Sequence, residues 1–271
     1  MKVGIVGGGL TGCIIAEYLR KKGASVTVFD SLEKMGASKA ALGLIAPQWI
    51  ARVEDVDLGM EALEEIGGGG LVEHLDFEIK NPVKNFRQQI MRFNTQALVY
   101  GCEKRWDKVV EVRNQKTLVF ADGDEMTFDI IILAAGIWCN AFIPELALSG
   151  KTGSTLFALA SDNAEVKNKI EMYAPFKQAV SFQSEGFVHF GDGTSVKEYK
   201  EDHLKRTIDR ASRYGNLKKH YAVTTGTRPF STCNPNGVFK RVGKTLWVAT
   251  GGAKNGTILA GIWANKLGKM I

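Results

Sequence analysis

The chain opens with the segment Val3-Gly4-Ile5-Val6-Gly7-Gly8-Gly9-Leu10-Thr11-Gly12. Within it, Gly7, Gly9 and Gly12 fit the pattern G-x-G-x-x-G. In that pattern the first glycine allows a tight turn, the second lets the backbone approach a pyrophosphate, and the third lets the next helix pack closely on the strand. The N–H groups at the start of that helix then point at phosphate oxygens. The segment therefore predicts the phosphate-binding turn of a dinucleotide site.

The residues around this turn complete the expected unit. Residues 3–6 are apolar and predict a buried strand, and residues 11–22 predict a helix that ends at Gly23. Residues 25–29 predict a second strand, which Asp30 follows directly. A carboxylate at this place accepts hydrogen bonds from ribose hydroxyls. Because strand, turn, helix, strand and acid occur in this order, a dinucleotide site is favoured over an ordinary glycine-rich turn.

The composition is that of an ordinary globular protein, with 45% hydrophobic and 24% charged residues in a chain of 271. That length allows one large domain or two closely associated ones. The four cysteines are scattered without a C-x-x-C pair, and the four histidines show no metal-ligand spacing. We therefore expect no metal site, no disulfide framework and a reducing cytoplasmic location. No apolar run reaches the roughly 18 residues that a membrane-spanning helix needs, so no membrane association is expected.

The net charge of +6 has two interpretations. Residues 197–220 hold eight Lys or Arg against four Asp or Glu. Leu204, Ile208 and Ala211 form an apolar stripe at helical spacing, which predicts a solvated helix whose charges cover the opposite face. Alternatively, the basic run is a contact surface for an anionic partner. Composition alone favours the solvated helix.

The middle of the chain changes character several times. Residues 60–66 look helical, and residues 71–94 look irregular with strand character. Residues 97–128 alternate apolar and polar in three short runs, which predicts a small antiparallel β-meander. Residues 151–223 are strand-rich, with one amphipathic helix near residues 199–214.

Two further segments place small residues at the end of a strand. Residues 128–133 are almost wholly apolar, as in a parallel strand that is covered on both faces, and Ala134-Ala135-Gly136 follows them. Near the C-terminus, residues 245–249 predict a strand, Gly251-Gly252 a turn, and residues 257–267 a helix. Small residues at such places let the backbone pass close to a ligand.

Five motifs carry a resemblance to a known family. They are the N-terminal turn through Asp30; Gly36-Ala37-Ser38-Lys39; Trp106-Asp107-Lys108-Val109-Val110; Ala134-Ala135-Gly136-Ile137-Trp138; and Gly226-Thr227-Arg228-Pro229 with residues 249–257. With these motifs, the chain resembles the D-amino-acid oxidase and glycine oxidase family of FAD-dependent enzymes over nearly its whole length.

The resemblance implies an α/β fold in two parts. The first is a discontinuous Rossmann-like FAD-binding domain, with a parallel sheet and a β-meander, made of residues 1–70, 95–148 and 224–271. The second is a smaller antiparallel substrate domain made of residues 71–94 and 149–223. In the family, Arg228 corresponds to the arginine that pairs with the substrate carboxylate, and Lys254 stands where glycine oxidases often carry a second basic residue. Arginine suits this role because its planar fork donates two parallel hydrogen bonds to a carboxylate.

The resemblance also implies a set of cofactor contacts. The helix that begins near Thr257 would direct its N-terminus at the flavin pyrimidine and stabilise the negative charge that forms there on reduction. The expected FAD-binding residues are Gly7, Gly9, Leu10, Thr11, Gly12, Asp30, Ser31, Ala37, Ser38, Lys39, Val109, Ala135, Gly136, Trp138, Gly251, Gly252, Lys254, Asn255, Gly256 and Thr257.

Two features depart from the family pattern. The family usually has Asp-Gly-x-Pro soon after the Arg-Pro pair, whereas this chain has Ser231-Thr232-Cys233-Asn234-Pro235-Asn236-Gly237. The chain is also shorter than typical members, mainly between residues 47 and 95. A reduced pocket wall predicts a more open site.

Three functions remain open from the sequence. The first is an FAD-dependent oxidase that acts on the C–N bond of a glycine-like amino acid or secondary amine, with oxygen as the acceptor. The second is a flavoenzyme of the same fold that acts on an amino-acid-like group carried by a nucleotide or nucleic acid. The third is an FAD-binding protein without oxidase activity. An amine-oxidising flavoenzyme is favoured. The size of its substrate stays open between a small amine or amino acid and such a group carried on a nucleotide or nucleic acid.

Overall fold

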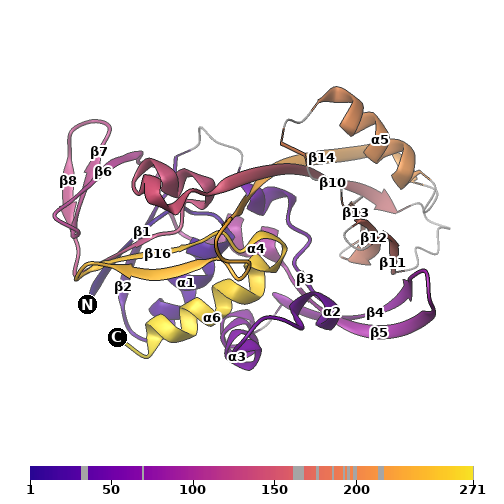
Figure 1. The fold of residues 1–271 in the computed structure, drawn as a ribbon, viewed down its shortest axis with the longest axis horizontal. Helices are drawn as coiled ribbons and strands as arrows, with labels where there is room; N and C mark the ends of the chain where they lie inside the picture. The colour runs from indigo at the N-terminus through magenta and orange to yellow at the C-terminus, as the bar shows by residue number, and fades with distance from the viewer. Residues whose placement is uncertain are drawn as a thin grey trace.

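A five-stranded sheet forms the core of one lobe of the molecule (Figure 1). The computed structural model describes residues 1–31, 36–68, 70–160, 168–174, 177–184, 186–191, 193, 196–197, 200–212 and 217–270. The sheet order is β15-β16-β9-β1-β2. Its strands are β1 (Lys2–Val6), β2 (Ser25–Phe29), β9 (Ile130–Leu133), β16 (Leu246–Thr250) and β15 (Val238–Val242). All neighbours are parallel except β15 and β16, so the apolar central strands are buried on both faces.

Helices cover one face of this sheet and a small meander covers the other. The helices are α1 (Leu10–Lys21), α3 (Val56–Gly67) and α6 (Gly256–Gly268), which share one apolar core. The meander consists of β6 (Val109–Arg113), β7 (Thr117–Phe120) and β8 (Glu125–Thr127), and it packs against the opposite face through Phe29, Phe120 and Phe128. This arrangement is the Rossmann-type layer that the sequence predicts.

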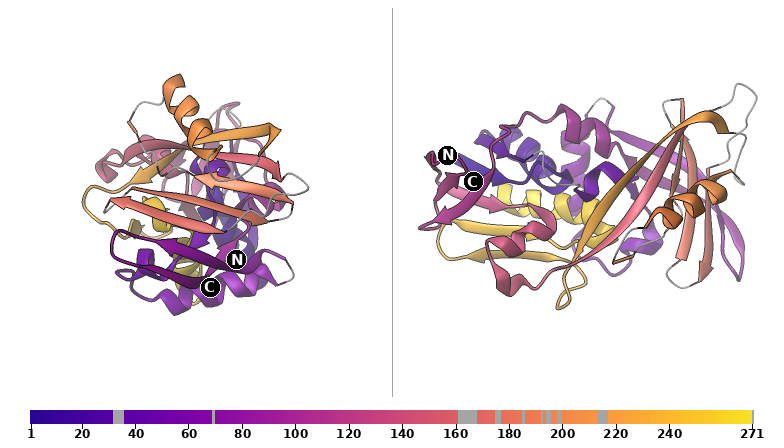
Figure 2. Two further views of the ribbon diagram at one scale, coloured as in Figure 1. Left: turned by 90° about the vertical axis from the view of Figure 1, so that its right-hand side faces the viewer. Right: turned by 90° about the horizontal axis from the view of Figure 1, so that it is seen from above.

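The second lobe is built on an eight-stranded sheet of order β14-β10-β13-β12-β11-β4-β5-β3. Every neighbouring pair is antiparallel except β4 and β11. Its strands are β3 (Leu44–Ile45), β4 (Val72–Lys80), β5 (Asn85–Phe93), β10 (Ser149–Ala160), β11 (Lys169–Ala174), β12 (Lys177–Ser184), β13 (Phe187–Gly191) and β14 (Leu217–Phe230). Figure 2 shows β10 and β14 running from the first lobe into the second. The α/β fold class with a second, mainly antiparallel part is confirmed, whereas the residue boundaries between the two domains stay a prediction.

Two sequence expectations need correction. Residues 71–94 form the regular hairpin of β4 and β5 rather than an irregular segment. The first of the three runs predicted as a meander is instead the helix α4 (Thr95–Gly101), because the Asn94 side chain accepts a hydrogen bond from the Ala97 N–H and caps it. The meander therefore begins at Val109.

The predicted amphipathic helix is α5 (Glu201–Ala211). Its apolar stripe packs on the second sheet, where Ile208 and Ala211 contact the cluster around Leu156 and Phe190. Parts of the basic run, residues 198–199 and 213–216, fall outside the described residues. In the part of the chain that is described, no helix has the length and apolar character needed to cross a membrane.

Candidate active site

The glycine-rich turn lies between the end of β1 and the start of α1. Gly7 has a φ of 110°, a left-handed conformation that favours glycine, and its N–H donates to the Phe29 carbonyl at 2.8 Å. A Cβ on Gly12 would overlap the carbonyl oxygen of Gly7. The helix thus approaches the turn as closely as the backbone allows, and α1 begins at Leu10 with its first N–H groups at the turn.

A cavity of about 620 Å³ opens on this turn. Asp30 and Ser31 line it from the end of β2, and Val109 lines it from the meander. The other expected cofactor residues on its wall are Gly7, Gly9, Leu10, Thr11, Ala37, Ser38, Lys39, Ala135, Gly136 and Trp138. The structure therefore brings these expected cofactor residues, from four of the five motifs, to one cavity. Gly12 lies behind the turn rather than on the cavity wall.

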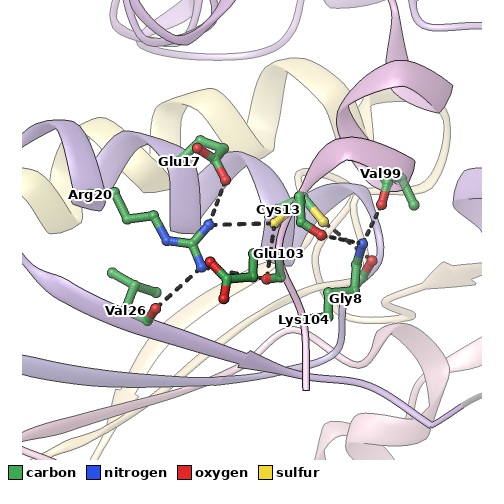
Figure 3. Close-up of polar contacts among 9 residues, drawn as sticks. Gly8, Cys13, Glu17, Arg20, Val26, Val99, Glu103 and Lys104 are labelled. Carbon is green, nitrogen blue, oxygen red and sulfur yellow. Dashed lines mark hydrogen bonds and ion pairs between the residues drawn. The ribbon is translucent and has the colours of Figure 1, made fainter. Parts of the chain in front are cut away.

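A polar network, drawn in Figure 3, supports the far side of the turn. The Lys104 ammonium donates to the Cys102 carbonyl at 3.1 Å and to the Val99 carbonyl, at the end of α4. Its stem crosses Gly8, where a Cβ would lie 2.5 Å from the Lys104 Cδ. The Cys13 thiol donates to the Gly8 carbonyl at 3.3 Å. Side chains of α1 and of the segment after α4 therefore hold the glycine-rich turn in place.

Asp30 is held beside this network. Its carboxylate accepts a hydrogen bond from the Ser31 N–H at 2.9 Å. Burial raises the pKa of Asp30 above its usual range, while this hydrogen bond and the nearby Lys104 ammonium oppose that rise. A partly buried carboxylate at the cavity wall is suited to accept hydrogen bonds from a hydroxyl group of a ligand.

A second, smaller cavity of about 170 Å³ adjoins the first. The two share six lining residues: Leu10, Thr11, Ala37, Ser38, Gly136 and Pro229. The start of α6 supplies Gly256 and Thr257 to its wall, and the turn after β16 supplies Gly251, Gly252 and Lys254. Asn255 lies in the short turn η4 (Ala253–Asn255) and lines neither cavity. The two cavities therefore adjoin along these shared residues.

Arg228 projects from β14 into the wall of this second cavity. Burial lowers the pKa of its guanidinium, and no ion pair or hydrogen bond joins it to any described residue. Among the described residues that line this cavity, none is an Asp or a Glu. A buried cation without a counter-ion is costly unless a ligand supplies the anion. Lys254 is exposed at the rim.

Comparison with known proteins finds a family model that matches the N-terminal part of the chain. Residues 2–83 match the model described as DAO, FAD dependent oxidoreductase. A stretch of 45 residues is 49% identical to a D-proline dehydrogenase of Pyrobaculum islandicum, and this stretch makes up 17% of this chain and 12% of that protein. The N-terminal part of the chain is thus similar to a DAO-type FAD-dependent oxidoreductase domain.

Solved structures share the fold of this chain along almost its entire length. Glycine oxidase from Bacillus cereus superposes with a TM-score of 0.73 at 14% identity, over 99% of this chain and 94% of its own. Iminodiacetate oxidase from Chelativorans sp. gives 0.72 at 16%, over 98% and 93%. L-proline dehydrogenase from P. horikoshii gives 0.72 at 12%, over 99% and 92%. These structures show that the chain shares their fold, and at such low identities they show the fold alone.

Sequence reasoning missed several residues on the cavity walls, among them Lys104 and Trp49. Lys104 has no motif around it, and only folding brings it across Gly8. Trp49, in the short helix α2 (Pro47–Ile50), lines the second cavity. Both lie outside the family's motifs, so spacing gave no signal for them. The segment 231–237, where the sequence departs from the family pattern, contributes no residue to the lining of either cavity.

Proposed function

We propose that this protein oxidises the C–N bond of a glycine-like amino acid or a secondary amine. The substrate carboxylate pairs with Arg228 in the smaller cavity. The observation that carries this proposal is the partly buried Arg228 guanidinium, which faces the smaller cavity and has no acidic neighbour or counter-ion among the described residues. An α-carboxylate supplies the missing charge and fits the guanidinium fork with two parallel hydrogen bonds.

The two adjoining cavities suit FAD. The ADP half fits the larger cavity, where the glycine-rich turn and the start of α1 offer N–H groups to a pyrophosphate and Asp30 offers a carboxylate to the ribose. The flavin end then lies toward the start of α6, at Gly256 and Thr257. That helix terminus favours negative charge on a neighbouring ring. Val109 and Trp138 complete the wall of the larger cavity.

This chain's residues act mainly by orienting the substrate. Bound FAD would accept a hydride from the substrate α-carbon at N5, and the electrons would then pass to oxygen, giving an imine and hydrogen peroxide. Arg228 fixes one end of the substrate, so that the α C–H bond is presented in one orientation. Among the described lining residues no acidic side chain offers the amine an anionic partner, and such an environment favours the neutral amine that hydride loss requires.

The first experiment is the visible absorbance spectrum of the purified protein, with the cofactor released by heat and identified. Anaerobic reduction by glycine, sarcosine and other small amines then tests the substrate class. A protein that binds no flavin, even after reconstitution with FAD, contradicts the proposed function.

Arg228→Ala tests the carboxylate site directly. The variant should retain FAD but bind a carboxylate substrate more weakly by about 2–4 kcal/mol, because a charge-assisted pair is lost. The apparent affinity is measured from the flavin spectrum during titration. Arg113→Ala is a suitable control, because Arg113 pairs with Glu111 and Glu125 on the exposed meander. Unchanged binding and kinetics in Arg228→Ala would remove this residue from the site.

A further inference from the structure

A short turn connects the cofactor cavity to the strands that carry Arg228. The turn η1 (Ala37–Ala40) supplies Ala37, Ser38 and Lys39 to the wall of the larger cavity. At its beginning, the Ser38 hydroxyl accepts a hydrogen bond from the Leu10 N–H at 2.7 Å. The turn is therefore fastened to the glycine-rich loop at the start of α1.

At its other end, η1 is bonded by two threonines of the second sheet. The Thr224 hydroxyl donates to the Lys39 carbonyl at 2.9 Å, and the Thr155 hydroxyl donates to the Ala40 carbonyl at 2.7 Å. The last carbonyls of a helical turn have no partner within the turn, so these side chains satisfy two groups that would otherwise be open. Two consecutive carbonyls are thus held by two different strands.

The two threonines are direct partners across the sheet. Thr155 on β10 pairs in register with Thr224 on β14. Arg228 lies four residues further along β14, and side chains alternate along a strand, so Thr224 and Arg228 share one face. Gly226 lies between them, and a Cβ there would be 2.8 Å from the Ala37 Cα. Strand β14 therefore contacts η1 with the same face that carries the Arg228 side chain.

We propose that Thr155 and Thr224 are positioning residues that hold η1 in register with Arg228, so that cofactor and carboxylate binding strengthen each other. The inference rests on the proposed function, because it takes Arg228 as the carboxylate ligand. The two hydroxyls fix the distance between the turn that contacts the cofactor and the strand that contacts the substrate. Without them, the buried Ala40 carbonyl and the more exposed Lys39 carbonyl lose their donors, and η1 is free to move relative to β14.

Thr224 is the better position for the test, because it lines neither cavity. An effect of Thr224→Val on ligand binding is then transmitted through η1. Valine keeps the shape of threonine and removes the hydroxyl, whereas Thr224→Ser keeps the hydroxyl. Thr152→Val is a matched control on the same pair of strands, since the Thr152 hydroxyl bonds the Thr227 hydroxyl at 2.9 Å and does not bond η1.

The experiment measures the coupling between two ligands, with acetate as the carboxylate probe. The Kd of FAD is determined with and without saturating acetate, and the Kd of acetate is determined in the holoenzyme from the flavin spectrum. Thermodynamic linkage requires that acetate changes the Kd of FAD by the same factor by which FAD changes the Kd of acetate. We expect acetate to tighten FAD binding in the wild-type protein, and we expect Thr224→Val to reduce this factor at least threefold. Thr224→Ser and Thr152→Val should keep it.

Several outcomes would overturn the inference. They are a wild-type protein without coupling, an unchanged factor in Thr224→Val, or an equal loss in Thr152→Val. If Thr224→Val does not fold, Thr155→Val with Thr155→Ser makes the same comparison at the other hydroxyl. Arg228→Ala separates the two proposals: if it leaves acetate binding intact, the proposed function fails. If it abolishes acetate binding while Thr224→Val keeps the full factor, only the coupling inference fails.

Discussion

Gly12 shows how one residue limits the whole cofactor site. A Cβ at this position would overlap the Gly7 carbonyl oxygen, which is backbone and cannot move aside as a flexible side chain can. Gly12→Val should therefore push α1 away from the turn and abolish FAD retention, seen as a loss of visible absorbance in the purified protein. Gly101→Ala is the control, because no atom lies within 4 Å of a Cβ there. A yellow Gly12→Val protein that still contains FAD would contradict this placement of the turn.

Individual residues also show which parts of the site could be predicted from the sequence and which could not. Gly7 and Asp30 were predictable because their chemistry depends on local spacing within one strand-turn-helix unit. Arg228 was predictable through its Arg-Pro motif. Lys104 was not, because its contact with the turn joins residues 8 and 104 and is created only by the packing of the segment after α4.

At the scale of elements, α3 and α6 cross at two glycines. A Cβ on Gly261 would lie 2.5 Å from the Gly59 carbonyl oxygen, and a Cβ on Gly59 would lie 2.7 Å from the Ile258 Cδ1. Gly261→Ala should destabilise the protein by about 1–3 kcal/mol through overpacking, although alanine favours a helix. Chemical denaturation measures this, with Gly101→Ala as the exposed control. Equal or greater stability of Gly261→Ala would mean that the helices separate at little cost.

Helix α4 shows why local pattern alone misplaced one element. Its sequence contains the β-branched residues Thr95 and Val99 and the aromatic Tyr100, which favour a strand. The Asn94 cap and the burial of Leu98 and Val99 against the α1 layer outweigh that preference. The longer elements α1 and α6 were predicted to within a residue or two, because their periodicity and flanking glycines agree with their burial.

At the scale of the whole molecule, the site depends on the junction between two lobes. The larger cavity is built mostly by the first lobe, whereas Arg228 comes from β14 of the second sheet. Strands β10 and β14 extend from one lobe into the other (Figure 2). Strand β14, which carries Arg228, therefore packs directly against the turn η1, which lines the larger cavity. Local patterns predicted both halves, but the register between them comes from long-range contacts such as that of Gly226 with Ala37.

Stability of the whole chain should depend on pH through His189 on β13. The His189 ring stacks on Phe182 with centroids 4.6 Å apart. Burial, with a further contribution from the Arg92 charge, lowers the pKa of His189 to about 4, below its usual value of 6.5. Arg92 is itself paired with Glu73 and bonded to Ser184, so it cannot turn away without breaking those contacts.

A histidine whose pKa is lower in the folded state takes up its proton more readily when unfolded. The contribution of neutral His189 to the stability of the folded state is therefore complete above about pH 6.5 and is lost as the pH falls toward 4. Each pKa unit corresponds to about 1.4 kcal/mol, so the free energy of unfolding should fall by up to about 1.4 kcal/mol between pH 6.5 and 5.5.

Chemical denaturation at pH 7.0, 6.5 and 5.5 measures this fall in the free energy of unfolding. His189→Phe should flatten this dependence, because phenylalanine keeps the stacking on Phe182 without binding a proton, whereas His74→Gln on the exposed side of β4 should leave it unchanged. The same slope in His189→Phe and wild type would assign the pH dependence to other groups.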